Sequence, residues 1–201
     1  HLWEYKYIPQ IIKEKSMPPM QEIAFRILVT TVDSWEEFSH WWRKRIEGKT
    51  EPDEPIKEKV AELTKGLSTP KEKIEAIFDY VKREIRYVSI DFGKSGYEPG
   101  AAKKVFENKY GDCKDKSTLL ITMFKIAGIP ASYVLVPTSG IGNLVKDFPY
   151  PFQFDHCIVA VENEGGYHFL DPVAESYRFD DLPAMDRNRD VLVFQDQKFV
   201  F

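Results

Sequence analysis

A cysteine at the start of an apolar run is the residue of this chain best placed for chemistry. Cys113 follows Gly111 and Asp112, and the apolar positions within residues 119–127 recur at helical spacing. The thiolate is the reactive form of cysteine, and a free thiol is mostly protonated at neutral pH. The N-terminus of a helix carries about half a positive charge, which stabilises a thiolate placed there. We therefore expect Cys113 to be a nucleophile in the first turn of a helix, with Asp112 as the N-cap.

A histidine and an aspartate on later segments supply the other two groups that such a nucleophile needs. His156 lies in a predicted strand, and Asp171 follows the next strand, after the turn-forming residues 163–166. A hairpin brings the two side chains together, so that the carboxylate can orient the imidazole and the imidazole can take the thiol proton. Each residue alone has a more common structural explanation, as a buried thiol, a core histidine or a turn-forming aspartate. Their joint occurrence in this order favours a Cys-His-Asp catalytic site.

The surroundings of the thiol both oppose and assist this chemistry. Asp112 and Asp115 suit a helix start, but their negative charges disfavour a thiolate, and we expect the imidazolium of His156 to outweigh them. The backbone N–H of Cys113 is a natural donor to the oxyanion of an acyl-transfer intermediate. Spacing does not identify the second oxyanion donor, for which the candidates are Tyr87 and Gln153.

A zinc site is the main chemical alternative. Cys113, His156, Cys157 and Asp171 could nominally supply four ligands. Neighbouring residues on a strand point to opposite faces, so we expect His156 to face Cys113 while Cys157 packs on the other side. The sequence also contains no CxxC pair. We therefore expect neither a metal nor a cofactor.

The composition is that of an ordinary globular protein. The 201 residues carry a net charge of −4, which gives no electrostatic reason to expect nucleic acid as a partner. No apolar stretch approaches the roughly 20 residues that insertion across a membrane requires. Two cysteines are too few for a disulfide framework. The chain begins with His1 rather than Met, so we expect a processed protein or a fragment of a longer one.

Hydrophobic periodicity and turn residues predict helices first and antiparallel strands later, an α+β architecture. The predicted helices cover residues 35–46, 56–65, 70–85, 101–108 and 113–127, and the predicted strands cover 23–32, 87–90, 131–136, 154–162, 167–170, 191–194 and 198–201. We expect two parts: an N-terminal lead-in over residues 1–54, with a strand and a Trp-rich helix, and a catalytic core over residues 55–201. Core packing explains the tryptophans better than a cofactor does.

These motifs together resemble the transglutaminase-like superfamily, a branch of the papain-like cysteine enzymes. The resemblance covers about residues 68–172 and lies in Gly111-Asp112-Cys113, the segment 127–131, His156 and Leu170-Asp171-Pro172. Ile85-Arg86-Tyr87 and the stretch from Gly111 to Ser117 are similar to a bacterial subgroup in which this core follows a β-rich domain of unknown function.

The resemblance implies a papain-like fold in which Cys113, His156 and Asp171 attack an amide through a thioester and pass the acyl group to an amine or to water. It implies a protein or peptide substrate and favours a periplasmic or secreted location. Ile158 stands where many relatives have an aromatic residue, and Tyr87 where eukaryotic relatives use Trp at the oxyanion. No calcium-loop pattern is present, so calcium dependence is not expected. The alternative function is a binding or scaffold module that keeps the fold without turnover.

Overall fold

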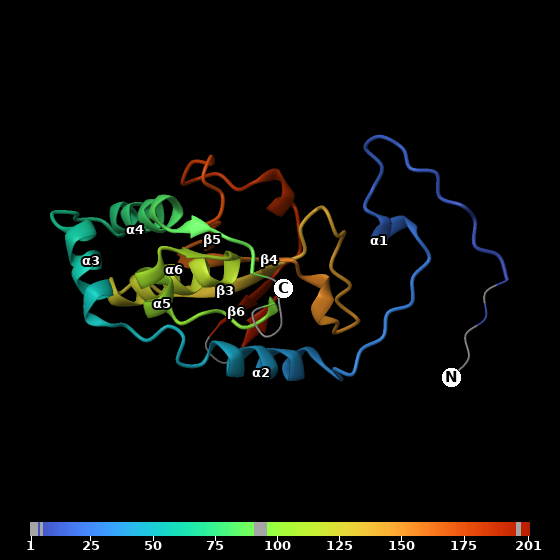
Figure 1. The fold of residues 1–201 in the computed structure, drawn as a ribbon, viewed down its shortest axis with the longest axis horizontal. Coiled ribbons are helices and arrows are strands. Elements are labelled where there is room, and N and C mark those ends of the chain that lie inside the picture. Colours follow the sequence, from blue (N-terminus) through green and yellow to red (C-terminus); the bar gives the residue numbers. More distant parts are fainter. Residues whose placement is uncertain (1–3, 5, 91–95, 196–197) are drawn as a thin grey trace.

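A five-stranded antiparallel sheet is formed by the last third of the chain (Figure 1). The computed structural model describes residues 4, 6–90, 96–195 and 198–201. The strands lie in the order β5-β4-β3-β6-β7, and their bounds are β3 Ala131–Val136, β4 His156–Asn163, β5 Gly166–Leu170, β6 Leu192–Phe194 and β7 Phe199–Val200. The central strand β3 pairs with β4 from Ala131 opposite Val161 to Val136 opposite His156. This register puts His156 at one end of the sheet.

Both faces of the central strands are buried, which explains why their sequences are nearly continuous apolar runs. Alternate side chains enter two separate clusters. Leu135 and Cys157 belong to the large cluster shared with the helices, whereas Val136 and Ile158 belong to a smaller cluster on the opposite face. Leu182, from the long loop after β5, packs against the smaller cluster.

The helix that begins with the cysteine lies at the centre of the structure. α6 (Cys113–Ile126) packs on the sheet on one side and on the helices α3 (Glu54–Thr64), α4 (Pro70–Glu84) and α5 (Ala102–Asn108) on the other. Every residue of α6 from the first through the twelfth is buried. The helices predicted at these positions are confirmed. A helix with one apolar stripe buries only one face, whereas α6 is buried on all sides along most of its length.

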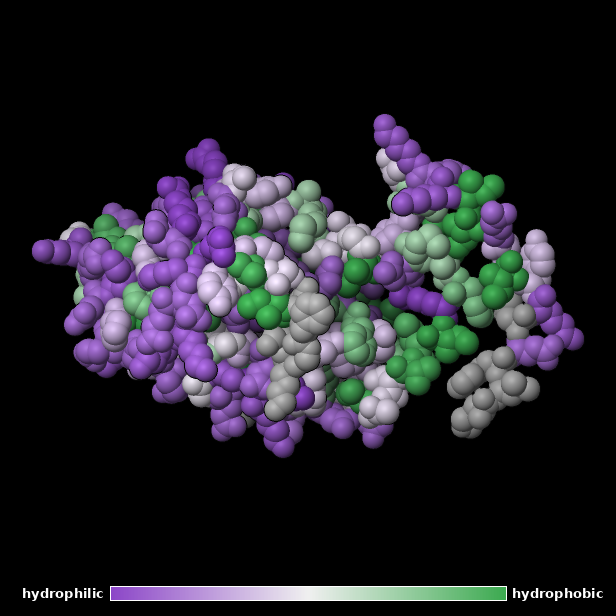
Figure 2. Space-filling model, in the orientation of Figure 1, coloured by the Kyte–Doolittle hydropathy of each residue, from purple (hydrophilic) through white to green (hydrophobic). Residues whose placement is uncertain are grey.

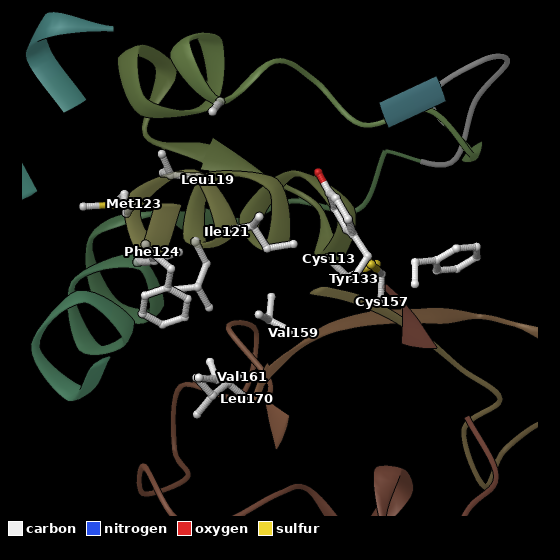
Figure 3. Packing of buried hydrophobic residues seen from close by; sticks show 14 of the residues in the cluster. Cys113, Leu119, Ile121, Met123, Phe124, Tyr133, Cys157, Val159, Val161 and Leu170 are labelled. Carbon is white, nitrogen blue, oxygen red and sulfur yellow. The ribbon is translucent and has the colours of Figure 1, made fainter. Parts of the chain in front are cut away.

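Apolar contacts hold α6 against the sheet. Figure 3 shows part of the large cluster from close by, with Phe124 of the helix on the side of the sheet residues Val159 and Leu170. Burying a side chain of this size stabilises a fold by about 1.5–3 kcal/mol. The start of α6, and with it Cys113, is thereby fixed relative to the strands that carry His156.

The helix starts follow the capping residues that the sequence offers. The Thr69 hydroxyl accepts a hydrogen bond from Glu72 N at 3.2 Å, and the Glu72 carboxylate accepts one from Thr69 N at 2.8 Å, so α4 begins with a capping box. The Ser34 hydroxyl accepts one from Glu37 N at 3.1 Å and starts α2 (Trp35–Ile46). Trp42 of α2 lies in the large cluster, as expected for core packing.

A short parallel pair anchors the segment before the cysteine. β1 (Arg86–Tyr87) and β2 (Tyr110–Gly111) pair with Tyr87 opposite Gly111. A further backbone hydrogen bond, from Val88 N to Gly111 O at 2.9 Å, extends the contact. Pairing with Tyr87 and its neighbours therefore holds in place the segment that leads into α6.

The strand predicted over residues 23–32 is wrong. A one-turn helix, α1 (Met20–Ile23), occupies its beginning, and residues 24–33 have no regular secondary structure. β-rich composition forms a strand only where a partner strand accepts its backbone hydrogen bonds. Within the described residues, no strand pairs with this segment.

None of the helices in the described ranges combines the length and apolar character that crossing a membrane requires.

Candidate active site

Cys113 is the first residue of α6, and its side chain is 9% exposed. The Asp112 carboxylate accepts hydrogen bonds from Lys114 N at 2.9 Å and Asp115 N at 3.1 Å. The Asp115 carboxylate accepts one from Asp112 N at 3.2 Å, which completes a capping box. The predicted N-cap is confirmed. The helix N-terminus therefore places its partial positive charge at the thiol.

Glycines leave room for the Asp115 side chain. Asp115 Oδ1 accepts a hydrogen bond from Gly100 N at 2.6 Å. A Cβ on Gly111 would lie 2.5 Å from the Cβ of Asp115, closer than any real contact. Burial, assisted by repulsion from Asp112, raises the pKa of the Asp115 carboxyl. The glycine of the Gly-Asp-Cys motif is thus required by the close approach of the helix cap.

His156 and Asp171 lie together at the end of the sheet. His156 Nε2 is 3.2 Å from Asp171 Oδ2, and the side chains are 8% and 3% exposed. The N–H direction is poorly aligned with the carboxylate, so this contact is an ion pair rather than a well-formed hydrogen bond. Asp171 Oδ1 accepts a hydrogen bond from Val173 N at 2.9 Å, which fixes the orientation of the carboxylate.

The same imidazole reaches the cysteine. Burial alone would lower the pKa of His156, but its polar contacts with Asp171 and Cys113, together with the negative charges of both, raise the pKa to about 11. The imidazole is therefore held in its protonated form between a carboxylate and a sulfur. The structure brings together all three residues that the sequence singled out.

Cys157 does not lie where strand alternation placed it. The two faces of β4 differ as expected, but the face that carries Cys157 is the one packed on α6, in the same cluster as Cys113 (Figure 3). His156 reaches the thiol from the end of the strand instead. Complete burial raises the pKa of Cys157 well above its usual value, so this thiol stays protonated.

A cavity of about 420 Å³ is lined by Cys113, His156 and Cys157. Six aromatic residues contribute to its walls: Phe38, Trp41, Trp42, Tyr87, Tyr97 and Phe154. Three of these come from α2, which therefore shapes the site as well as the core. A larger cavity of about 760 Å³, beside Pro130 and Glu162, contains none of the Cys-His-Asp residues.

The two candidate oxyanion donors have different positions. Tyr87 lines the cavity. Gln153 does not: its Nε2 donates to the carbonyls of Phe148 and Val145 at 2.8 and 3.3 Å, and its Oε1 accepts from Val145 N at 2.6 Å. The amide of Gln153 is occupied by the loop before β4, so the expectation for this residue is corrected.

A lysine beside the thiol was missed from the sequence. Lys114 lines the cavity, and its Nζ lies 2.7 Å from Asp112 Oδ2. Burial opposes its charge, but attraction to Cys113 and the contact with Asp112 raise its pKa. Asp112 is therefore neutralised locally, and a second cation besides His156 favours a thiolate. Its position directly after Cys113 in the sequence was the one sign that could have indicated a cation beside the thiol.

One group of His, Cys, Asp and Glu side chains in the ranges that the structure describes is close enough together to share a metal ion. His156, Asp171 and Asp186 offer ligand atoms within 4.8 Å of one another. This group contains neither Cys113 nor Cys157, so the four-ligand zinc set is not formed. Asp186, in the short 3-10 helix η3 (Ala184–Asp186), was also missed, because a lone acidic residue in a loop follows no periodic pattern.

Comparisons with known proteins bear on the family and the fold of the chain. Residues 57–172 match the family model of the transglutaminase-like superfamily. A crystal structure of a candidate protease from Parabacteroides distasonis is similar with a TM-score of 0.58 and 23% identity, over 70% of this chain and 27% of that chain. A candidate cysteine protease from Cytophaga hutchinsonii matches with a TM-score of 0.44 and 19% identity, over 59% of this chain and 37% of that one. No curated protein matches.

The chain thus spans about a quarter of the length of the Parabacteroides protein. At this level of identity the likeness concerns the fold, and the expected α+β, papain-like architecture is confirmed.

Proposed function

The chain belongs to the transglutaminase-like superfamily, and from this membership we propose that it is a cysteine-nucleophile enzyme acting on amide or peptide bonds. Cys113 is the nucleophile, His156 the acid–base group and Asp171 the residue that orients the imidazole. The observation that carries the proposal is the position of His156, which lines the same cavity as Cys113 and whose Nε2 lies 3.2 Å from Asp171 Oδ2.

The reaction follows from the charges of this arrangement. The thiolate of Cys113 attacks the carbonyl carbon and forms a C–S bond. As the tetrahedral intermediate collapses, the C–N bond breaks and the imidazolium of His156 gives its proton to the departing amine. The resulting thioester is attacked by water or by a second amine, whose proton returns to the imidazole. The shape of the cavity decides between hydrolysis and transfer.

Features of the cavity favour a protein or peptide as the proposed substrate. The backbone N–H of Cys113, at the start of α6, is a donor for the oxyanion, and Tyr87 is the side chain of the cavity proposed as the second. The aromatic walls suit an apolar side chain next to the scissile bond. Lys114 adds a positive charge close to the reacting carbonyl.

Selective alkylation tests the proposal. Iodoacetamide is expected to label Cys113 rapidly at pH 7, with labelling followed by mass spectrometry of the peptides. His156→Ala is expected to slow the labelling about 100-fold or more. His40→Ala is the matched control, because His40 is exposed on α2 and does not line the cavity, so its loss leaves the rate at Cys113 unchanged. Labelling of Cys113 no faster than Cys157 would contradict the proposal and favour a scaffold module.

A further inference from the structure

A second carboxylate lies buried beside His156 and Asp171. Asp186 is 5% exposed, and its ligand atom lies within 4.8 Å of those of the other two residues. Neither of its oxygens accepts a hydrogen bond from a described residue. A buried carboxylate without a donor is costly, and such groups concentrate at functional sites. Its segment lies beyond residues 57–172, which match the superfamily.

The neighbouring carboxylates have hydrogen-bond donors, which sets Asp186 apart. Asp155 accepts from the backbone N and the hydroxyl of Thr138 at 2.8 and 2.7 Å. Asp171 accepts from Val173 N on one oxygen and faces the imidazole with the other. Asp186 instead lies close to Asp171 and to the imidazole of His156.

We propose that Asp186 is a positioning residue that acts through His156: it shares a proton with Asp171 under acidic conditions and, once ionised, joins Asp171 in stabilising the imidazolium. This inference rests on the function proposed above. It assigns a role to a residue of the segment after β5, and it makes the reactivity of Cys113 depend on two carboxylates rather than one.

The proton balance follows from the charges that meet at this point. While Asp186 is protonated, its O–H donates to Asp171, and the pair carries one negative charge. When the proton leaves to solvent, two carboxylates face one imidazolium, and the thiolate–imidazolium pair becomes more stable. Burial raises the pKa of Asp186 to about 6, with the charge of Asp171 adding to this effect and the cation of His156 opposing it.

Other charged groups act on the same place. Asp155, just before β4, adds a negative charge that favours protonated Asp186. Lys116, on α6, acts on Asp171 from the helix side. Neither group replaces Asp186, because the first has its own donors and the second donates to a backbone carbonyl.

The test is the pH dependence of iodoacetamide labelling at Cys113 in the full chain between pH 4 and 10. In Asp186→Asn the amide imitates the protonated acid at every pH. The rise in the labelling rate that accompanies the ionisation of Asp186 near pH 6 is therefore expected to disappear from the acidic limb. Asp181→Asn is the matched control, since Asp181 lies in the same segment in a surface ion pair with Arg187; its limb is expected to stay in place.

A second measurement needs no variant. The carboxyl carbon of Asp186 in the unmodified protein is expected to titrate near pH 6 by NMR, compared with about 4 for an ordinary aspartate. An unchanged limb in folded Asp186→Asn, or titration near pH 4, would overturn the inference while leaving the nucleophile intact. Stoichiometric binding of zinc chloride that Asp186→Asn abolishes would overturn it too, by making the group a metal site. If iodoacetamide labelled Cys113 no faster than Cys157 in the unmodified protein, both this inference and the proposed function would be contradicted.

Discussion

Lys116 lies one helical turn after Cys113 and is fully buried, an unusual place for a lysine. Its Nζ donates to Lys82 O at 3.1 Å. Burial lowers its pKa to about 8, although attraction to Glu175 and Asp171 works in the opposite direction. Its burial was not predicted from the residue type, because a lysine in a helix usually faces solvent. Its positive charge therefore destabilises the folded state, and the size of this effect on the free energy of unfolding depends on pH.

Lys116→Met tests this cost. An unfolded chain holds the lysine proton up to pH 10.5, whereas the native state loses it near pH 8. Between these values the unfolded state binds more protons, so the contribution of Lys116 to stability rises with pH and is lost as pH falls through 8. From pH 7.5 to 10, the free energy of unfolding should rise by about 2 kcal/mol more in the unmodified protein than in the variant.

Urea unfolding at the two pH values measures this difference, because the other titrating groups cancel between the two proteins. Lys125→Met is the control: Lys125 lies on the same helix with its side chain 54% exposed, and its loss should leave the pH dependence unchanged. Equal pH dependence in Lys116→Met and the unmodified protein would show that Lys116 titrates like a solvated lysine.

At the scale of the element, the start of α6 depends on Gly111. A Cβ at this position would meet the Cβ of Asp115 at 2.5 Å, an atom that no side-chain rotation can move away. Gly111→Ala is therefore expected to displace the capping box, to cost about 2 kcal/mol of unfolding free energy and to slow labelling of Cys113. Urea unfolding and iodoacetamide kinetics on the same preparation measure both effects.

Gly165→Ala is the matched control for this prediction. Gly165 lies in the turn between β4 and β5, and the nearest atom to an added Cβ is Asn163 Oδ1 at 3.7 Å. We expect a change in unfolding free energy of less than about 0.5 kcal/mol. If the two alanine variants behaved alike, the close approach at Gly111 would not be a constraint.

Most elements of the body could be read from local signals. The capping pattern from Asp112 to Asp115 marked the start of α6, and the apolar run at residues 131–136 gave β3 with its bounds. The strand expected over residues 23–32 failed because pairing is not a local property. β-rich residues indicate that a strand is possible, and only the rest of the fold decides whether a partner is present.

The order of the motifs and the geometry of the hairpin were enough to predict Cys113, His156 and Asp171, but not the residues around them. Alternation along β4 separated His156 from Cys157, but it could not tell which face packs on α6. Gln153 was a candidate because of its residue type, and its loop contacts depend on tertiary structure. Asp186 comes to the histidine through a loop, and no spacing rule connects the two residues.

At the scale of the whole molecule, residues 6–33, which precede α2, lie to one side of the body (Figure 1). Figure 2 shows hydrophobic side chains on the surface of this part. Its large exposed apolar residues are Tyr7, Ile8, Ile11, Ile12, Met20, Ile23, Phe25, Ile27 and Val29. α2 is different, because its Phe38 and Trp42 lie in the large cluster and its Trp41 lines the cavity. The two parts of the N-terminal region should therefore contribute very differently to stability.

Two variants measure this contrast by urea unfolding. Removal of residues 1–29 is expected to change the free energy of unfolding by less than about 1 kcal/mol, because exposed side chains gain little from folding. Phe38→Ala is expected to cost about 3–5 kcal/mol, because it opens a hole in the packing between α2 and the sheet. The shortened chain should also label Cys113 at the original rate, since α2 and the walls of the cavity remain. A deletion as costly as Phe38→Ala would mean that the N-terminal segment belongs to the folding unit, and the body would then begin well before α2.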